Sequence, residues 1–182
     1  MPSPTSSTMP SPSSSGVAPR GCGAPPAVPT PKVMGEFDAV WVFFRVGAVP
    51  CALPAGAVES VERELAVTPA AGAPRSVAGL ALVRGHVVPV VDLHRLFGQP
   101  APRSGGSYLV VRLASGQSAA LWVSDTEDIE RVEPHAFQSV AIPGRRSRYA
   151  RRVIVREDGR LWLALDAERL VVKGARNVAQ AA

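Results

Sequence analysis

The sequence predicts an all-β protein with two small barrels or sandwiches, and three observations lead to this prediction. Short apolar segments rich in valine and leucine recur along the chain, with turn residues at intervals of about eight to twelve positions. A polar segment rich in Pro and Gly at residues 99–106 separates two groups of such segments, which follow a similar order. The long helical patterns that a parallel sheet requires between its strands do not occur. We therefore expect one set of short strands on each side of this linker.

The two ends of the chain are expected to lie outside the folded domain. Residues 1–31 are rich in Pro, Ser, Ala and Thr and nearly free of charge, a composition that cannot bury enough apolar surface to fold. We assign residues 1–35 to a disordered tail, which is either a tether or peptide ligand or a dispensable extension. The domain is expected to span residues 36–172, and residues 173–182 to form a C-terminal tail.

The first group of strands begins directly after the tail. Residues 40–46 are predominantly β-branched and aromatic, which favours a strand, and residues 47–50 turn the chain. Residues 51–54 form a short second strand, whose final Pro54 indicates an edge or a strand end. Residues 58–61 are compatible with a strand or with a single helical turn.

The stretch at residues 77–98 reads VAGLALVRGHVVPVVDLHRLFG and is the most committed local pattern of the chain. Its nearly continuous apolar run predicts buried strands, and Arg84-Gly85 marks the bend between them. Asp92 is a suitable helix N-cap, and Gly98 is a suitable residue to end that helix. The predicted elements are paired strands at 80–83 and 87–91 and a helical turn at 92–97.

The second group of elements follows the linker and ends in a short helix. Ser115-Gly116 and the triplet Glu157-Asp158-Gly159 are expected to form tight hairpin turns. The expected strands, loops and helix are a strand at 108–113, a strand at 118–123, an acidic mixed segment at 124–133, a long loop at 134–148, strands at 151–156 and 161–165, and a helix at 167–172.

Composition excludes several classes of protein. The formal net charge is +5 with the excess almost entirely arginine, and aromatic residues make up 5%, which argues against a stacking platform for single-stranded nucleic acid. The two cysteines, Cys22 and Cys51, form no zinc or disulfide pattern. No apolar stretch is long enough to span a membrane, and no signal peptide is evident, so a cytoplasmic location without membrane insertion is expected.

Catalytic and metal-binding patterns are equally sparse, so no enzyme activity and no cofactor are predicted. The three histidines, His86, His94 and His135, belong to no catalytic motif, although a Ser/His/Asp or Cys/His/Asp site can be imagined around Asp92. Five acidic residues between 125 and 133 lack the spacing of a metal loop and are interpreted as a solvated strand or turn face, or as an ion-pair surface for a partner.

Two arginine features remain open. The cluster at residues 145–152 is either a solvated loop or a phosphate- or acid-binding patch, which makes a basic nucleic-acid-binding barrel the alternative function of the chain. Arg84 lies within the apolar stretch at residues 77–98 and must be paired or held at a surface. It is either a structural partner of Asp92 or Asp125 or an interface arginine, and its spacing alone favours neither.

The central stretch resembles the core motif of the CheW-like chemotaxis coupling proteins. The order Gly79, Arg84-Gly85, Pro89 and Asp92-Leu93 follows the pattern G-x-x-x-x-R-G-x-x-x-P-x-x-D-L. The resemblance extends from about Phe37 to Val172 through an opening hairpin, a strand at 121–125 and a closing hairpin at 153–170. It implies two five-stranded SH3-like barrels with a short C-terminal helix, at about 36–98 and 104–166, with a first strand that both barrels could share.

The same resemblance implies a non-enzymatic adaptor that links chemoreceptors to a CheA-type histidine kinase in the cytoplasm, including at receptor arrays on the membrane. Its implied partners are the regulatory domain of the kinase and the cytoplasmic tip of the receptors, with no nucleic acid. The chain departs from the family pattern at Cys51, Ser60, Leu121, Glu127 and Arg151-Arg152. The residues implied in partner binding are Arg84, then Val58, Glu59 and Ser60 on the kinase-facing strand, and Leu109 and Val110 near the receptor groove.

Overall fold

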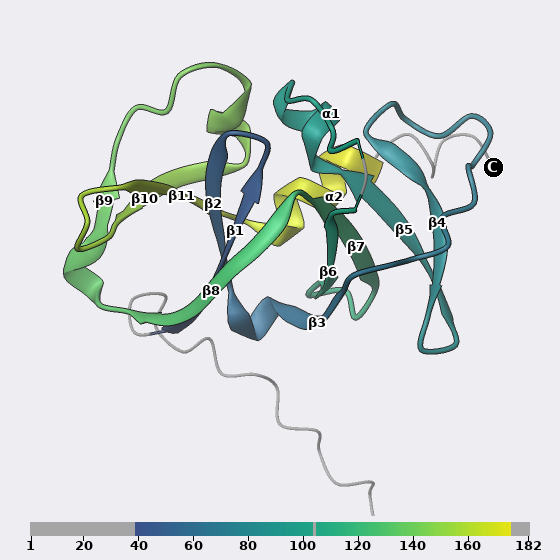
Figure 1. Cartoon of the computed structure of the whole chain (residues 1–182), viewed down its shortest axis with the longest axis horizontal. Helices are drawn as coiled ribbons and strands as arrows, with labels where there is room; N and C mark the ends of the chain where they lie inside the picture. The colour runs from purple at the N-terminus through teal and green to yellow at the C-terminus, as the bar shows by residue number, and fades with distance from the viewer. Residues whose placement is uncertain (1–38, 104, 176–182) are drawn as a thin grey trace, which may run out of the picture. The chain divides into compact units, whose positions relative to one another are not determined.

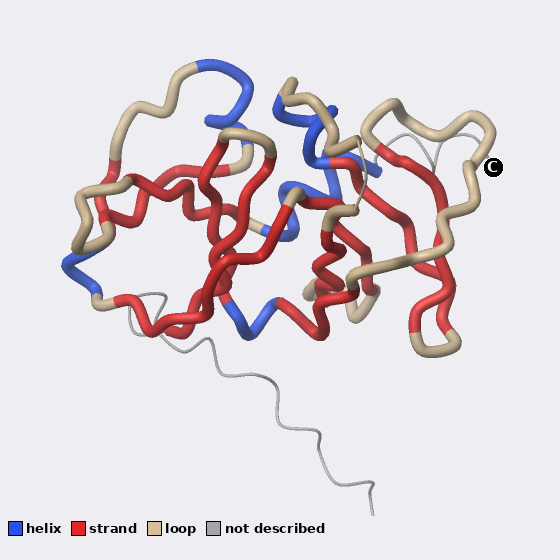
Figure 2. The backbone as a smooth tube through the Cα atoms, viewed as in Figure 1, coloured by secondary structure: helices blue, strands red, loops and turns tan. Residues whose placement is uncertain are grey.

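Two β-sheets account for most of the computed structural model, which describes residues 39–103 and 105–175. Short helical elements connect the strands, as Figures 1 and 2 show. The tail expected at residues 1–35 lies outside the described residues, as do residues 176–182. None of the helices in the described part of the chain is long and apolar enough to cross a membrane.

The first sheet combines strands from both ends of the described chain. Its order is β8-β1-β2-β11-β10-β9, and β11 runs parallel to β2, with Leu163 opposite Cys51. The remaining neighbours are antiparallel. The six strands are β1 (Ala39–Val46), β2 (Val49–Pro54), β8 (Asp125–Val132), β9 (Phe137–Ser139), β10 (Ala150–Val155) and β11 (Leu161–Leu165).

The second sheet contains the middle of the chain in the order β3-β6-β7-β5-β4. Here β5 runs parallel to β7, with Val90 opposite Ala120. Its strands are β3 (Val58–Glu62), β4 (Val77–Val83), β5 (His86–Asp92), β6 (Ser107–Arg112) and β7 (Ser118–Val123). The helical elements are α1 (Leu93–Phe97), α2 (Ala167–Ala175), and three 3-10 helices, η1 (Ala55–Ala57), η2 (Pro134–Ala136) and η3 (Gly144–Arg148).

The chain after β3 returns to the opposite edge of the second sheet. Thr68 and Leu80 exchange two backbone hydrogen bonds of 2.8 Å. Gly79 permits this approach, because a Cβ atom at this position would lie 2.2 Å from the carbonyl oxygen of Thr68. The segment that follows β3 is therefore bonded to the edge strand β4 at the other side of the sheet.

The division of the chain between the sheets differs from the expected one. Sequential barrels at 36–98 and 104–166 were predicted, but the five-stranded sheet takes residues 58–123, and the six-stranded sheet takes 39–54 and 125–165. The parallel pairs join segments far apart in the sequence, and local apolar periodicity carries no information on such pairs. Residues 58–61 belong to a strand, not to a helical turn, because they pair with β6.

The core consists of three apolar clusters, one of which joins the two sheets. Trp41, Phe43 and Trp162 lie in the cluster of the first sheet, and Val83, Val90 and Val110 lie in that of the second. The largest cluster joins both sheets: it contains Phe44 and Leu53 from the first sheet, Leu109 and Leu121 from the second, and Leu170 from α2. Strand β1 is therefore buried on both faces, since its successive residues enter different clusters.

In the central stretch at residues 77–98 the predicted strands and helical turn are confirmed, but the predicted burial of both strands is wrong. Asp92 caps α1 by accepting hydrogen bonds from the backbone N–H groups of His94 and Arg95, and Gly98 ends it at φ 66°. The two strands are not buried along their whole length. Ala81 faces inward, whereas the larger side chains of Leu80, Leu82 and Val87 are exposed. The pattern that was interpreted as a continuous buried run is thus a two-residue alternation with apolar residues on both faces.

Candidate functional site

A small cavity on the second sheet brings together four of the six residues that the sequence analysis selected, namely Arg84, Glu59, Ser60 and Val110. Its volume is about 220 Å³. Strand β3 provides Glu59 and Ser60, β6 provides Val110, and the turn between β4 and β5 provides Arg84. Three segments that are separate in sequence therefore meet at one place. Further lining residues are Val83, His86, Val88, Arg112 and Ser118.

Glu59 is held in this site by two side chains that the sequence analysis did not select. Its carboxylate accepts hydrogen bonds from the Ser118 hydroxyl at 2.6 Å and from Arg112 Nε at 2.7 Å. The Ser118 hydrogen bond is the largest cause that lowers the pKa of Glu59, and the charges of Arg112 and Arg84 add to it against a penalty from burial. Glu59 is thus an ionised, fixed acceptor beside Arg84 at neutral pH.

Arg84 is exposed and forms no ion pair or hydrogen bond within the described residues. Neither expected structural partner is available to it: Asp92 binds His94 and Arg95 in the interior, and Asp125 bonds to the backbone N–H of Thr126. Positive φ angles of 49° at Arg84 and 83° at Gly85 match a type I′ turn. The turn requires this conformation, which costs a residue such as Arg about 1 kcal/mol, so the choice of Arg84 over Asn or Gly is not explained by folding.

Beside Arg84, the outer face of the β4–β5 hairpin presents Leu80, Leu82 and Val87, which we name the hairpin face. Leu82 and Val87 are opposite each other in the register and are 66% and 67% exposed. Leu80 is 40% exposed. A contiguous apolar strip on an edge strand is typical of a protein-binding surface. The sequence signal for this surface was the alternation of Leu with Ala and Val at residues 80–83. It was not recognised because the whole stretch is apolar.

The other two selected residues are less accessible. Leu109 is fully buried in the cluster that joins the sheets, and Val58 packs against the same cluster. Val110 lines the cavity but is 2% exposed. Leu109 was expected near the receptor groove. Its side chain points into the core, so it is not accessible for a direct contact with a receptor.

An Asp–His–Ser chain lies in the interior, near the junction of the two sheets. His94 Nδ1 is 3.3 Å from Asp92 Oδ1, and His94 Nε2 is 2.8 Å from Ser124 Oγ. His94 and Asp92 are 0% and 1% exposed, and Ser124 Oγ also accepts the backbone N–H of Gly47. Because His94 and Asp92 are buried and Ser124 is partly buried, we interpret this chain of contacts as structural.

Burial alone would raise the pKa of Asp92, but the hydrogen bonds and charges of His94 and Arg95 lower it below its ordinary value. Burial raises the pKa of the Cys51 thiol, which is therefore protonated and unreactive. Within the part of the chain that the structure describes, no group of three or more His, Cys, Asp or Glu side chains could hold a metal ion.

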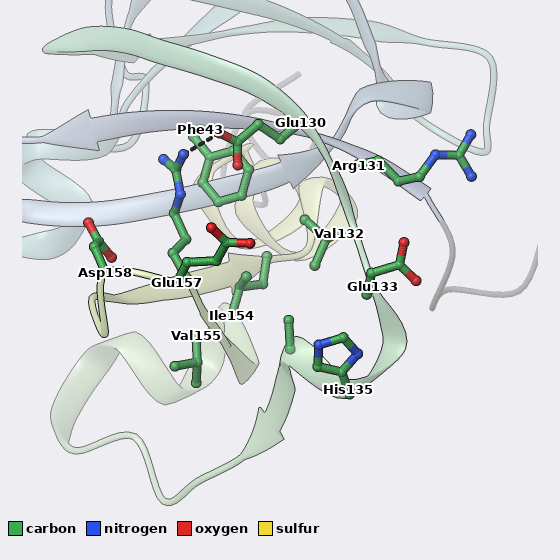
Figure 3. Close-up of a pocket in the computed structure, with 12 residues that line it drawn as sticks. Phe43, Glu130, Arg131, Val132, Glu133, His135, Ile154, Val155, Glu157 and Asp158 are labelled. Atoms are coloured by element: carbon green, nitrogen blue, oxygen red, sulfur yellow. Dashed lines mark hydrogen bonds and ion pairs between the residues drawn. The ribbon is translucent and has the colours of Figure 1, made fainter.

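The acidic strand β8 faces a larger cavity of about 650 Å³ beside β10, shown in Figure 3. Arg156 pairs with Glu130 and lies 3.5 Å from Asp128, while its guanidinium group is 4.9 Å from the ring centroid of Phe43. Glu127, also on β8, pairs with Arg45 of the neighbouring strand β1. The acidic run is thus a strand face with internal ion pairs, in agreement with its interpretation as a solvated strand.

Two packed β-sheets with an exposed apolar hairpin define a protein-interaction module. The family model of the CheW-like domain matches residues 41–174, and the chain belongs to this family. The crystal structure of the scaffolding protein TtCheW from Thermoanaerobacter tengcongensis superposes with a TM-score of 0.66 at 18% identity, and the match covers 75% of this chain and 95% of that one.

The fold is therefore that of two SH3-like barrels. No curated protein sequence matches the chain. Family membership places the chain among chemotaxis scaffold and adaptor proteins, a family that is not catalytic.

Proposed function

We propose that the chain is a non-enzymatic adaptor that couples chemoreceptors to a CheA-type histidine kinase. The observation that carries this proposal is the unpaired, exposed Arg84 in a strained turn at the end of the hairpin face. An exposed arginine beside apolar residues offers five N–H donors in a fixed geometry, which suits a partner's carboxylate or carbonyl groups. A role in binding would explain why Arg84 occupies a turn position that is unfavourable for its backbone.

The regulatory domain of the kinase is the proposed partner of the cavity and the hairpin face. Leu82 and Val87 would be buried on association, while Glu59 and Arg84 provide adjacent charges of opposite sign. Stable interfaces bury roughly 1,200–2,000 Å² in total, and a transient one buries less. These two neighbouring charges would set the orientation of the partner and disfavour partners that place a like charge opposite them.

The cytoplasmic tip of the chemoreceptors is the second proposed partner. Leu109 and Val110 would act here by holding strand β6 in position, since both side chains are buried. Val58 would hold β3 in the same way on the kinase-facing side. We place the protein in the cytoplasm, including at receptor arrays on the membrane, without insertion into the bilayer. Neither a cofactor nor catalysis is part of this proposal.

A binding experiment with purified partners tests the proposal. The full chain is immobilised and challenged at moderate salt with the regulatory domain of the CheA-type kinase from the same cell and with a cytoplasmic receptor fragment. Retention of both, and formation of a ternary complex, is the expected result. Failure to retain either protein, together with steeply salt-dependent retention of DNA or RNA, would replace the adaptor with the nucleic-acid-binding alternative.

A further inference from the structure

A third cavity, which shares no lining residue with the other two, is lined by arginines and by no acidic side chain. Its volume is about 600 Å³, within the range of ligand pockets. Arg75 comes from the loop before β4, Arg95 from α1, and Arg145 and Arg148 from η3. Tyr149, at 6% exposed, and Leu96 provide apolar lining.

Arg95 is fixed within this cavity by two contacts. Its Nε atom lies 3.1 Å from Asp92 Oδ2, and its NH1 group donates to the backbone carbonyl of Arg75 at 3.2 Å. Asp92 is itself 1% exposed and accepts a backbone hydrogen bond at the start of α1. Its carboxylate is therefore fixed in place and holds Arg95 in one position. A guanidinium group held in this way needs little ordering when an anion binds.

The other three arginines have no acidic partner. Arg75, Arg145 and Arg148 are exposed, and no carboxylate of the described residues forms an ion pair with them. Several arginines elsewhere in the described chain do pair, such as Arg45 with Glu127, Arg112 with Glu59 and Arg156 with Glu130. Like charges gathered around one void repel each other, and an anion in that void relieves this repulsion.

We propose that this cavity binds a phosphoryl group that is part of a multiply charged anion. Guanidinium groups bind phosphate in two-point geometry, and a polyphosphate brings more negative charge into a limited volume than a single carboxylate does. A soluble polyphosphate or nucleotide and a phospholipid headgroup share this chemistry. The proposal goes beyond the adaptor function and does not depend on it.

Occupation of the cavity would connect the two sheets. Arg75 and Arg95 belong to segments that flank β4 and β5, whereas Arg145 and Arg148 lie in η3, which precedes β10 of the other sheet. One anion bound to both sides adds a contact between the barrels that exists only with the ligand present. Its binding would raise the melting temperature of the protein by mass action.

Calorimetric titration of the full chain with inorganic tripolyphosphate at constant ionic strength tests the site. Saturable binding is expected for the wild type, and the double variant Arg145→Gln/Arg148→Gln should weaken it about tenfold or more. The control Arg63→Gln/Arg103→Gln removes the same charge from exposed positions outside the cavity and should leave affinity within about twofold. If both double variants weaken binding equally, or the wild type does not saturate, the proposal is wrong.

A third variant guards against a folding defect. If circular dichroism shows that the double variant is unfolded, Arg75→Gln replaces it, because Arg75 lies in a different loop. Its affinity for tripolyphosphate must also fall below that of the control, and an unchanged value overturns the site.

Two further arms identify the source of the phosphoryl group. Flotation with phosphatidylcholine vesicles with and without cardiolipin tests a lipid headgroup, and titration with a nucleoside triphosphate tests a soluble source. Selective capture by either, lost in the cavity variant and kept in the control, supports the site. Affinity for single-stranded oligonucleotides that grows with their length and falls equally in both double variants indicates diffuse nucleic-acid binding and overturns the proposal.

Discussion

The imidazole of His94 and the hydroxyl of Ser124 lie 2.8 Å apart and connect the two sheets. Ser124 stands between β7 and β8, where the chain crosses from the second sheet to the first. Its hydroxyl oxygen also accepts the backbone N–H of Gly47 at 2.7 Å, and its own N–H donates to the carbonyl of Arg45. One serine thus fixes the β1–β2 turn against α1 through three hydrogen bonds.

Replacement of Ser124 by Ala is expected to lower the free energy of unfolding by about 1–3 kcal/mol, because two partially buried polar groups lose their partner. Urea denaturation followed by circular dichroism measures this change. Ser147→Ala is the control, since its hydroxyl donates to Gly144 on an exposed 3-10 helix, and it should change stability by less than about 0.5 kcal/mol. Equal effects of the two substitutions would contradict the connecting role of Ser124.

Acid should destabilise the protein through Asp92. In the folded state the pKa of Asp92 lies below its ordinary value of 3.8. The contribution of Asp92 to the free energy of unfolding is therefore complete above the pKa of the unfolded state and is lost as the pH falls through the pKa of the folded state. Asp92→Asn should reduce stability at neutral pH and flatten the decline below about pH 4. Urea midpoints measured against pH for both proteins test this, and parallel curves would exclude Asp92 as a source of the acid sensitivity.

Gly79→Ala should destabilise the second sheet, since the added Cβ atom would lie 2.2 Å from the carbonyl oxygen of Thr68. A displaced backbone bridge costs about 1–3 kcal/mol by analogy with overpacking. Gly56→Ala is the matched control, because a Cβ atom there meets no atom within 4 Å. Thermal unfolding should separate the two variants, and equal melting temperatures would show that the Thr68–Leu80 bridge adapts without cost.

Arg84→Asn separates binding from folding. Asn-Gly is the preferred pair for a type I′ turn, so the variant should keep or raise the melting temperature. Binding of the kinase regulatory domain should weaken at least about tenfold, because a charge-assisted contact is removed. Calorimetry and thermal unfolding are measured on the same sample. Unchanged affinity in a folded variant would remove Arg84 from the proposed interface.

Leu82→Gln tests the hairpin face. The side chain is 66% exposed, so stability should change by less than about 0.5 kcal/mol, while affinity for the kinase domain falls. Leu161→Gln is a matched control at 55% exposed on β11 of the other sheet. A pull-down that treats both variants alike would place the interface elsewhere.

Local features of the fold were predictable from the sequence because they depend on neighbouring residues. The turn at Arg84-Gly85, the Asp92 cap and the Gly98 stop follow from backbone conformations that few residues adopt or from short side-chain contacts. The helix predicted at 167–172 forms and continues to Ala175. The family motif also directed attention to Arg84, Glu59 and Ser60, which the structure brings to one cavity.

Long-range features were not predictable in the same way. Nothing in the periodicity of β2 indicates that it pairs in parallel with β11, and apolar residues on both faces of β4 hide which face is inside. Arg112 and Ser118 fix Glu59 across strand neighbours, and neither belongs to a motif. The arginine cavity likewise combines residues from three segments that are separate in sequence.

The interleaved strand order has a consequence for how the protein is made. During synthesis the five-stranded sheet has all its strands once residue 123 has emerged, whereas β2 must wait for its parallel neighbour β11, which ends at Leu165. Until then Phe43 and Phe44 lack their final neighbours and are exposed to aggregation. A ribosome stalled before residue 161 should therefore carry a folded middle and unprotected N-terminal strands. Limited proteolysis of stalled chains would reveal this.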